Sequence, residues 1–284
     1  MLCIKEGEPM AELYEQGNIR TGDGLDLFFC RNIPNRPRGI VVFLHSVAEH
    51  SGRYREVAAG LKEAGYGVYR FDCRGHGRSD GARGDVQCFL DYVCDADLMV
   101  KRARAHFPGL PVFLAGHSMG ALVAVAYAVL HPGKLRGEVT AGAAVRLPPA
   151  LGFLNGGTNG RERGDERFSL VMEEAERHAW RDDGLMLDSV TVRLAGNVWL
   201  YGADWFSGKV HEVETPLFIL HGEEDGFIPP DCSRWLFDSV SSPDRSMRVY
   251  PGRGHVLLKE RDEVLEDIIG WLDARTASPR NAAV

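Results

Sequence analysis

The sequence has no apolar run that approaches the roughly 20 residues of a membrane-spanning helix, so we expect no transmembrane segment. It also has no long basic run, and its net charge is −7, which argues against nucleic acid as a partner. Residues 1–10 include Lys5, Glu6 and Glu8 and therefore do not resemble a secretory signal peptide. Together these features predict a cytoplasmic protein.

The cysteines and histidines show none of the paired spacings that bind structural metals, so we expect no metal site. A chain of this length does not need disulfides, and we expect its thiols to be reduced. The six cysteines are Cys3, Cys30, Cys73, Cys88, Cys94 and Cys232. A glycine-rich stretch at residues 75–79 lacks the lysine of a phosphate-binding loop, so we do not expect it to bind a nucleotide.

The composition and patterning are those of a globular α/β protein. The chain has 284 residues, of which 44% are hydrophobic and 26% charged, enough for a sizeable core. Short apolar runs typical of buried strands alternate with amphipathic segments typical of helices, which predicts a mostly parallel sheet of the eight-stranded type with helices on both faces. After two strands within residues 11–33, strands are expected at 39–45, 66–71, 111–116, 137–145, 215–221 and 246–250, and helices at 54–64, 86–107, 119–130, 231–240 and 260–274.

One long segment interrupts this alternation. Residues 146–210 lie between two predicted strands, so we expect residues 1–145 and 211–284 to form the core and the segment between them to be a lid, or cap. Its first half is rich in glycine, and an exposed loop is the alternative interpretation of residues 153–168. Its second half is helix-like and aromatic, with Trp180, Trp199, Tyr201, Trp205 and Phe206.

A serine stands at the sharpest predicted turn of the chain. Residues 111–124 comprise a short apolar run, the sequence Gly-His-Ser-Met-Gly and a second apolar run rich in alanine and valine. Gly116 and Gly120 lie two residues on either side of Ser118, where side chains would collide in a tight strand–turn–helix. This spacing predicts a nucleophile elbow with Ser118 as the nucleophile. A serine that merely caps the helix would leave the second glycine unexplained.

A serine hydroxyl needs a base, and ligand sites in parallel sheets lie beyond the carboxyl ends of strands. The strand predicted at 246–250 is followed by a glycine-bracketed loop that contains His255. His255 is also the only histidine after His221. We therefore expect His255 to be the base; a surface loop histidine is the alternative.

The base in turn needs an acid that holds its tautomer. The strand predicted at 215–221 is followed by three carboxylates, Glu223, Glu224 and Asp225. We favour Asp225, a short side chain beside Gly226, with Glu224 as the alternative. The resulting order of serine, aspartate and histidine is the one that accompanies a nucleophile elbow.

Backbone N–H groups must stabilise the oxyanion that forms during acyl transfer. We expect one donor to be Met119, which follows the nucleophile, and the other to be Val47, in the loop after the strand that ends at His45. The remaining histidines have weaker claims. His117 is expected to pack structurally, and the group His45, His50 and His76 to shape the pocket rather than to react.

With these residues assigned, the chain resembles the α/β-hydrolase family and, within it, the monoacylglycerol lipase/lysophospholipase group. The resemblance spans roughly residues 20–274 and implies an α/β-hydrolase fold with an inserted lid. It implies Ser118 as nucleophile, Asp225 as acid, His255 as base, and Val47 and Met119 as oxyanion donors. Four blocks carry it, at residues 45–54 (His-Ser-Val-Ala-Glu-His-Ser-Gly-Arg-Tyr), 72–81 (Asp-Cys-Arg-Gly-His-Gly-Arg-Ser-Asp-Gly) and 116–120 (Gly-His-Ser-Met-Gly), and in the pair 221–225 (His-Gly-Glu-Glu-Asp) with Gly254-His255.

The first block departs from the family pattern. Where the family usually has His-Gly-x-Gly, this chain has Ser46 and Ala48 in place of both glycines. If these positions require a positive φ, serine and alanine will strain the loop that presents Val47.

The leading hypothesis is a serine hydrolase that cleaves carboxylic esters of single-chain lipids through an acyl-enzyme, without a cofactor. A general carboxylesterase for small esters is the nearest alternative. A peptidase of the proline-iminopeptidase type would need acidic groups to bind a free amino terminus, for which Glu173, Glu174 and Glu176 are candidates. A non-catalytic binding protein would not need a complete serine, aspartate and histidine set. The aromatic part of the lid is a candidate for peripheral membrane contact, and the oligomeric state is left open.

Overall fold

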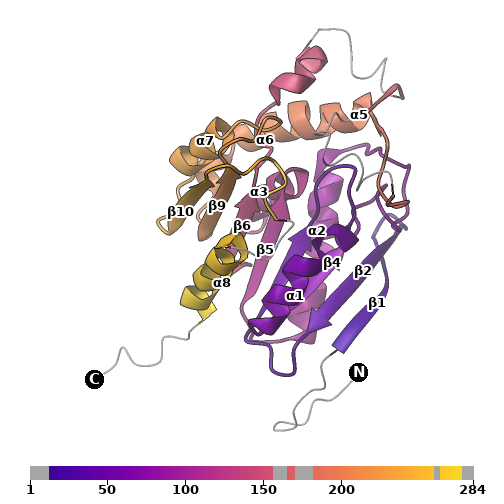
Figure 1. Ribbon diagram of the computed structural model, residues 1–284. Coiled ribbons are helices and arrows are strands. Elements are labelled where there is room, and N and C mark those ends of the chain that lie inside the picture. The colour runs from indigo at the N-terminus through magenta and orange to yellow at the C-terminus, as the bar shows by residue number, and fades with distance from the viewer. Residues whose placement is uncertain (1–12, 156–164, 170–181, 259–262, 277–284) are drawn as a thin grey trace.

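The chain folds around one twisted sheet of eight strands in the order β1-β2-β4-β3-β5-β6-β9-β10 (Figure 1). The structure is a computed structural model that describes residues 13–155, 165–169, 182–258 and 263–276. β1 and β2 pair antiparallel with each other, β2 pairs antiparallel with β4, and all other neighbours are parallel. The strands are β1 (Leu13–Arg20), β2 (Asp26–Ile33), β3 (Gly39–Leu44), β4 (Tyr66–Phe71), β5 (Val112–His117), β6 (Gly137–Ala141), β9 (Leu217–Gly222) and β10 (Arg245–Tyr250). The predicted sheet is confirmed.

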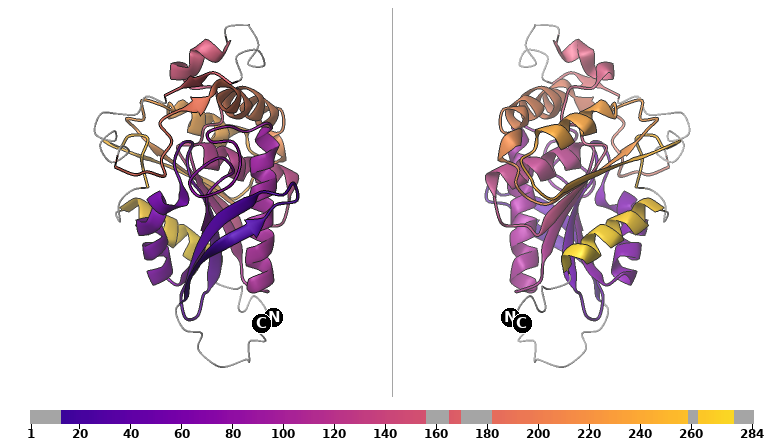
Figure 2. Two further views of the ribbon diagram at one scale, coloured as in Figure 1. Left: turned by 90° about the vertical axis from the view of Figure 1, so that its right-hand side faces the viewer. Right: turned by 90° about the vertical axis from the view of Figure 1, so that its left-hand side faces the viewer.

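Helices cover both faces of this sheet, as the alternating pattern predicts. Two of them, α1 and α8, pack on one face, whereas α2, α3 and α7 pack on the other (Figure 2). Because both faces are covered, β3, β4, β5, β6 and β9 are buried along their whole length, which explains why their sequences are mostly apolar. The helices are α1 (Arg55–Glu63), α2 (Phe89–His106), α3 (Met119–Leu130), α7 (Asp231–Ser239) and α8 (Glu263–Thr276).

Some element ends differ from the sequence-based expectation. The long helix begins at Phe89 rather than Val86, because Cys88 has extended backbone angles. The alanine-rich strand ends at Ala141 rather than Val145, and Gly142 then turns with a φ of 54°. None of the helices among the described residues is both long and apolar enough to cross a membrane.

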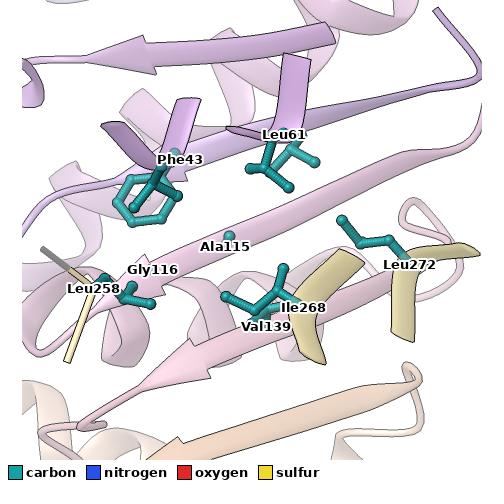
Figure 3. A pocket seen from close by; sticks show the side chains of 10 residues that line it. Phe43, Leu61, Ala115, Gly116, Val139, Leu258, Ile268 and Leu272 are labelled. Carbon is teal, nitrogen blue, oxygen red and sulfur yellow. The ribbon is translucent and has the colours of Figure 1, made fainter. Parts of the chain in front are cut away.

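A small apolar gap remains between the sheet and the helices α1 and α8 (Figure 3). Its free volume is about 10 Å³, and Phe43, Ala115, Val139 and Ile268 are among the side chains that surround it. It contains almost no polar surface and adjoins Gly116 from the face opposite α3. We therefore regard it as an imperfection of core packing rather than a ligand site.

The segment between β6 and β9 leaves the sheet and packs against the loops at the carboxyl ends of the strands (Figure 1). The N–H of Leu187 donates to the carbonyl of Ala48 at 2.9 Å, and the Thr191 hydroxyl donates to Asp85 at 2.7 Å. Within the predicted aromatic half, residues 192–207 form one helical stretch, which joins α5, the π-helical turn η3 and α6, whereas residues 182–191 are turns and the short strand β8. The elements of the segment are η2 (Pro149–Asn155), β7 (Arg167–Phe168), β8 (Val190–Thr191), α5 (Val192–Ala195), η3 (Gly196–Gly202), α6 (Ala203–Ser207) and η4 (Val210–Glu212). Residues 156–164 and Trp180, which the sequence analysis singled out, lie outside the described residues.

One buried carboxyl group in the sheet makes a stability prediction possible. Glu138 on β6 is fully buried, and neither of its side-chain oxygens has a hydrogen-bond partner within the described part of the chain. Burial raises the pKa of Glu138 well above its usual value. The folded protein therefore retains a proton that the unfolded chain releases once the pH exceeds about 4.5, so folding stability must fall as the pH rises through that value.

We expect Glu138→Gln to remove this dependence. Relative to the variant, the wild-type free energy of unfolding should fall by about 1 kcal/mol per pH unit above pH 4.5. Urea unfolding of both proteins between pH 4 and pH 8 measures the difference. Parallel stability curves would show that Glu138 does not carry a proton in the folded state.

Candidate active site

Ser118 lies at the turn between β5 and α3, and its backbone angles are φ 54° and ψ −113°. Such a conformation is strained for any residue with a Cβ atom, at a cost of about 1–3 kcal/mol, and it persists only where neighbours enforce it. Here the N–H of Ser118 donates to the Ala141 carbonyl at 2.9 Å. The strain is characteristic of a nucleophile elbow.

The two flanking glycines are required by close backbone contacts. A Cβ atom on Gly116 would lie 2.3 Å from the carbonyl oxygen of Gly120. A Cβ atom on Gly120 would lie 2.5 Å from the carbonyl oxygen of Leu44. Strand, turn and helix can approach this closely only because both positions lack side chains, as the sequence spacing predicts.

Three predicted residues are in hydrogen-bond contact. Nε2 of His255 lies 3.0 Å from Oγ of Ser118, and Nδ1 of His255 lies 2.7 Å from Oδ2 of Asp225. A carboxylate only accepts, so Nδ1–H donates to Asp225 and Nε2 is free to accept the serine proton. Ser118 is fully buried, and the two partners are 8% and 5% exposed. A serine bonded to an oriented imidazole is the arrangement that performs acyl transfer.

Asp225 is held by more donors than the sequence suggested. Its Oδ1 accepts from the N–H groups of Phe227 and Ile228 at 2.9 and 2.8 Å, while Nε2 of His221 lies 3.2 Å from Oδ2. Burial alone would raise the pKa of this carboxyl, but hydrogen bonds from His221 and His255 and the charge of His255 hold it well below its usual range. The alternative acid, Glu224, is exposed to solvent.

The loops that carry Asp225 and His255 are locked together by backbone contacts. The N–H of Glu224 donates to the Arg253 carbonyl at 2.9 Å. At Gly222, a Cβ atom would lie 2.3 Å from the carbonyl oxygens of Arg253 and Gly254. This glycine therefore permits the close approach of the two loops, as Gly116 and Gly120 do at the turn that carries Ser118.

The predicted oxyanion donors, Val47 and Met119, lie on the loop after β3 and at the first residue of α3. Within the described ranges, neither N–H group donates to a protein acceptor. An oxyanion site requires N–H groups that are free to donate in this way. At the two positions without the expected glycine, Ala48 has a φ of 61°, whereas Ser46 does not have a positive φ. The conditional expectation of strain therefore applies to Ala48 alone.

Ala48→Gly should stabilise the protein, because an L-residue at positive φ costs about 1–2 kcal/mol and glycine does not. Glycine also adds conformational entropy to the unfolded chain, which offsets part of this effect, so we expect the free energy of unfolding to rise by about 0.5–1 kcal/mol. Thermal and urea unfolding measure it, with Ser46→Gly as the matched control that should bring no gain. Equal effects of the two substitutions would contradict this account of the loop.

The other histidines of the site are structural. His45 accepts from the Cys73 N–H through Nε2 at 2.9 Å and donates from Nδ1 to the Ser46 carbonyl at 2.6 Å. Burial lowers the pKa of His45, and burial and the charge of His45 lower the pKa of His76 to about 3, so both rings are neutral. His50 donates to Asp183, in the segment between β6 and β9, at 2.8 Å. Among the described residues, none of the three forms a hydrogen bond with Ser118.

The sequence analysis assigned no role to three buried residues of this region. His221 contacts the carboxylate of Asp225, and Glu49 and Tyr54 form hydrogen bonds with each other and with His117. Glu49 and Tyr54 belong to a block singled out by its resemblance, but only their three-dimensional contacts indicate a role. No group of three or more potential metal ligands occurs among the residues that the structure describes.

Comparisons with known proteins agree with this geometry. Residues 35–262 match the family model described as serine aminopeptidase, S33. The chain is 31% identical over 256 residues to a monoacylglycerol lipase of Mycolicibacterium smegmatis, covering 83% of this chain and 88% of the relative. It is 29% identical to the human monoglyceride lipase, covering 94% and 93% of the two chains. Its fold matches that of a soluble variant of monoglyceride lipase from Saccharomyces cerevisiae, solved with a substrate analogue, with a TM-score of 0.81 at 21% identity over 96% of this chain and 98% of the other.

Proposed function

This chain belongs to the serine aminopeptidase S33 family of α/β hydrolases, and we propose that it hydrolyses carboxylic esters of single-chain lipids, such as monoacylglycerols. The observation that carries the proposal is the hydrogen-bonded chain from Ser118 through His255 to Asp225 at a strained elbow. The relatives support the substrate class, because both are lipases of monoacylglycerols by name.

In the proposed mechanism, Oγ of Ser118 attacks the ester carbonyl while Nε2 of His255 takes its proton. The carbonyl oxygen becomes an oxyanion that the N–H groups of Val47 and Met119 stabilise. His255 then gives the proton to the leaving alcohol, and the acyl group stays on Ser118. A water molecule, deprotonated by His255, attacks this acyl-enzyme and releases the fatty acid. Asp225 stabilises the imidazolium in both steps and keeps no proton itself.

We further propose that residues 146–210 act as the lid over this site. The lid helix contacts the base through a chain of rings. Trp199 packs edge-to-face on Phe227 at 6.0 Å between ring centroids, and Phe227 packs on His255 at 5.3 Å. Apolar groups next to the reacting atoms favour an apolar acyl chain over a polar substrate. The exposed Phe153 and Tyr201 on the same segment support peripheral contact with a lipid surface.

A cytoplasmic location is also a proposal. All five described cysteines are free thiols, which is typical of a reducing compartment. The aminopeptidase alternative depended on Glu173, Glu174 and Glu176, which lie outside the described residues. No contact among the residues that the structure describes bears on it, so it enters as an outcome of the experiment.

The experiment compares substrates of one series. We expect turnover of p-nitrophenyl esters to rise with acyl length, and monoacylglycerol to be hydrolysed faster than lysophospholipid or an aminoacyl p-nitroanilide. Preference for the acetate over every longer ester would contradict the lipid assignment and favour a general carboxylesterase. Preference for the anilide would favour a peptidase.

A further inference from the structure

The ring of His117, the residue before the nucleophile, faces the base. Its Nε2 lies 2.8 Å from the backbone carbonyl oxygen of His255, and the two imidazole centroids are 4.9 Å apart. A carbonyl oxygen only accepts, so Nε2 of His117 must carry a hydrogen. His117 is 1% exposed, so water cannot substitute for these partners.

The other nitrogen of His117 begins a chain of buried hydrogen bonds. Its Nδ1 lies 2.8 Å from the hydroxyl of Tyr54, and that hydroxyl contacts the carboxyl of Glu49 closely. The Tyr54 oxygen also accepts from the N–H of Ser46 at 3.3 Å. Glu49 and Tyr54 are 3% and 4% exposed. These buried hydrogen bonds therefore connect the loop that carries Ser46 and Val47 to the backbone of His255.

These hydrogen bonds need one proton more than Glu49, Tyr54 and His117 hold in their usual ionisation states. With an ionised Glu49, a neutral Tyr54 and a neutral His117, the tyrosine proton alone would have to serve two contacts. Either the carboxyl of Glu49 is protonated and Tyr54 donates to His117, or His117 is an imidazolium and Tyr54 donates to an ionised Glu49. In both arrangements the Tyr54 hydroxyl forms all the hydrogen bonds available to it, and the side chains of Glu49, Tyr54 and His117 together have no net charge.

We propose that Glu49, Tyr54 and His117 are positioning residues that hold the His255 backbone against the elbow and the oxyanion loop. The inference rests on the proposed function, since it assigns these residues to the support of its base. The neutral form of His117 is favoured because burial and the nearby charge of His255 lower the pKa of His117 to about 4. The charged or titratable groups that face the chain are His45, Arg53, Asp225 and His255.

This arrangement has a physical advantage for catalysis. The imidazolium that forms at His255 would be destabilised by a second cation at His117, only 4.9 Å away. A neutral His117 avoids this repulsion and still contacts both the Tyr54 hydroxyl and the His255 carbonyl. The chain also connects three segments that must keep a common geometry: the loop with Val47, the elbow and the His255 loop.

Substitutions at Tyr54 and Glu49 test the positioning role. Tyr54→Phe breaks both links, and we expect kcat to fall about 10–100-fold while KM changes less than about threefold. Glu49→Ala should cause a similar loss. Glu49→Gln should restore most of it with an unchanged pH profile of kcat/KM, because its side-chain amide can still form a hydrogen bond with the Tyr54 hydroxyl. Wild-type kcat in Tyr54→Phe, or a Glu49→Gln variant as impaired as Glu49→Ala or with a shifted pH profile, would overturn the proposal.

A spectroscopic measurement tests the proton position without relying on activity or on a variant that folds poorly. Nitrogen-15 NMR of the wild-type protein with labelled histidine distinguishes a ring nitrogen that carries a hydrogen from one that does not; the His117 signals are assigned by comparison with His117→Asn. We expect a bare Nδ1 and a protonated Nε2 at pH 7. Hydrogen on both nitrogens would show that His117 is an imidazolium and would contradict this arrangement of the hydrogen bonds. If the protein hydrolysed no ester, this result would still stand, and only the proposed function would fail.

Discussion

Ser118→Ala is expected to lower kcat for ester hydrolysis by about 10⁴- to 10⁶-fold, because without a nucleophile no acyl-enzyme forms. The residual rate would come from water attacking an ester that the oxyanion donors still bind. Steady-state hydrolysis of a p-nitrophenyl ester at saturating concentration measures the loss. The variant should fold normally, because alanine keeps the Cβ atom and the buried site loses only a hydroxyl.

Ser207→Ala is the matched control for this change, since it removes an exposed serine hydroxyl from the end of α6. Its kcat should equal that of the wild type. A Ser118→Ala variant that retained more than a few per cent of wild-type turnover would show that another group is the nucleophile.

Asp225→Asn should lower kcat by about 10⁴-fold through the tautomer of the base. The N–H groups of Phe227 and Ile228 already occupy one oxygen position of Asp225, so the amide oxygen of an asparagine will remain there. Its NH₂ group must then face His255 and donate to Nδ1. That reverses the imidazole tautomer and directs an N–H, not a lone pair, at Ser118.

The control for this prediction is Glu224→Gln, which changes the exposed carboxylate next to Asp225 and should leave kcat unchanged. Measurements across pH 5–9 separate an ionisation effect from a tautomer effect. The pKa of Asp225 is held well below this range, so the activity of the wild type should not depend on its titration there. Equal losses in Asp225→Asn and Glu224→Gln would contradict the assignment of Asp225 as the acid.

Local sequence patterns were sufficient for the fold and for the contact among Ser118, Asp225 and His255. The continuous apolar strands predicted a sheet covered on both faces, and two glycines around one serine predicted the elbow that the structure contains. Because ligand sites in parallel sheets lie beyond the carboxyl ends of the strands, the acid and the base were predicted in the loops after β9 and β10. In the structure these two loops lie next to Ser118. The catalytic roles of these residues, and of Val47 and Met119, remain proposals that the variants above test.

The supporting contacts could not be predicted from the sequence, because they depend on distances between segments far apart in the chain. The bond between Tyr54 and His117 joins residues 63 positions apart, and no periodicity identifies it. Similarly, the sequence allowed strain at both Ser46 and Ala48. Only the backbone path shows that Ala48 alone takes a positive φ, while its carbonyl is held by Leu187.

Covalent labelling with a fluorophosphonate tests the central claim most directly. The reagent reacts with an activated serine nucleophile, and intact-mass and peptide mass spectrometry identify the modified residue. We predict one adduct per chain, on Ser118, with no labelling of Ser118→Ala and strongly slowed labelling of Asp225→Asn. An unlabelled wild-type protein, or an adduct on any other residue, would contradict the account.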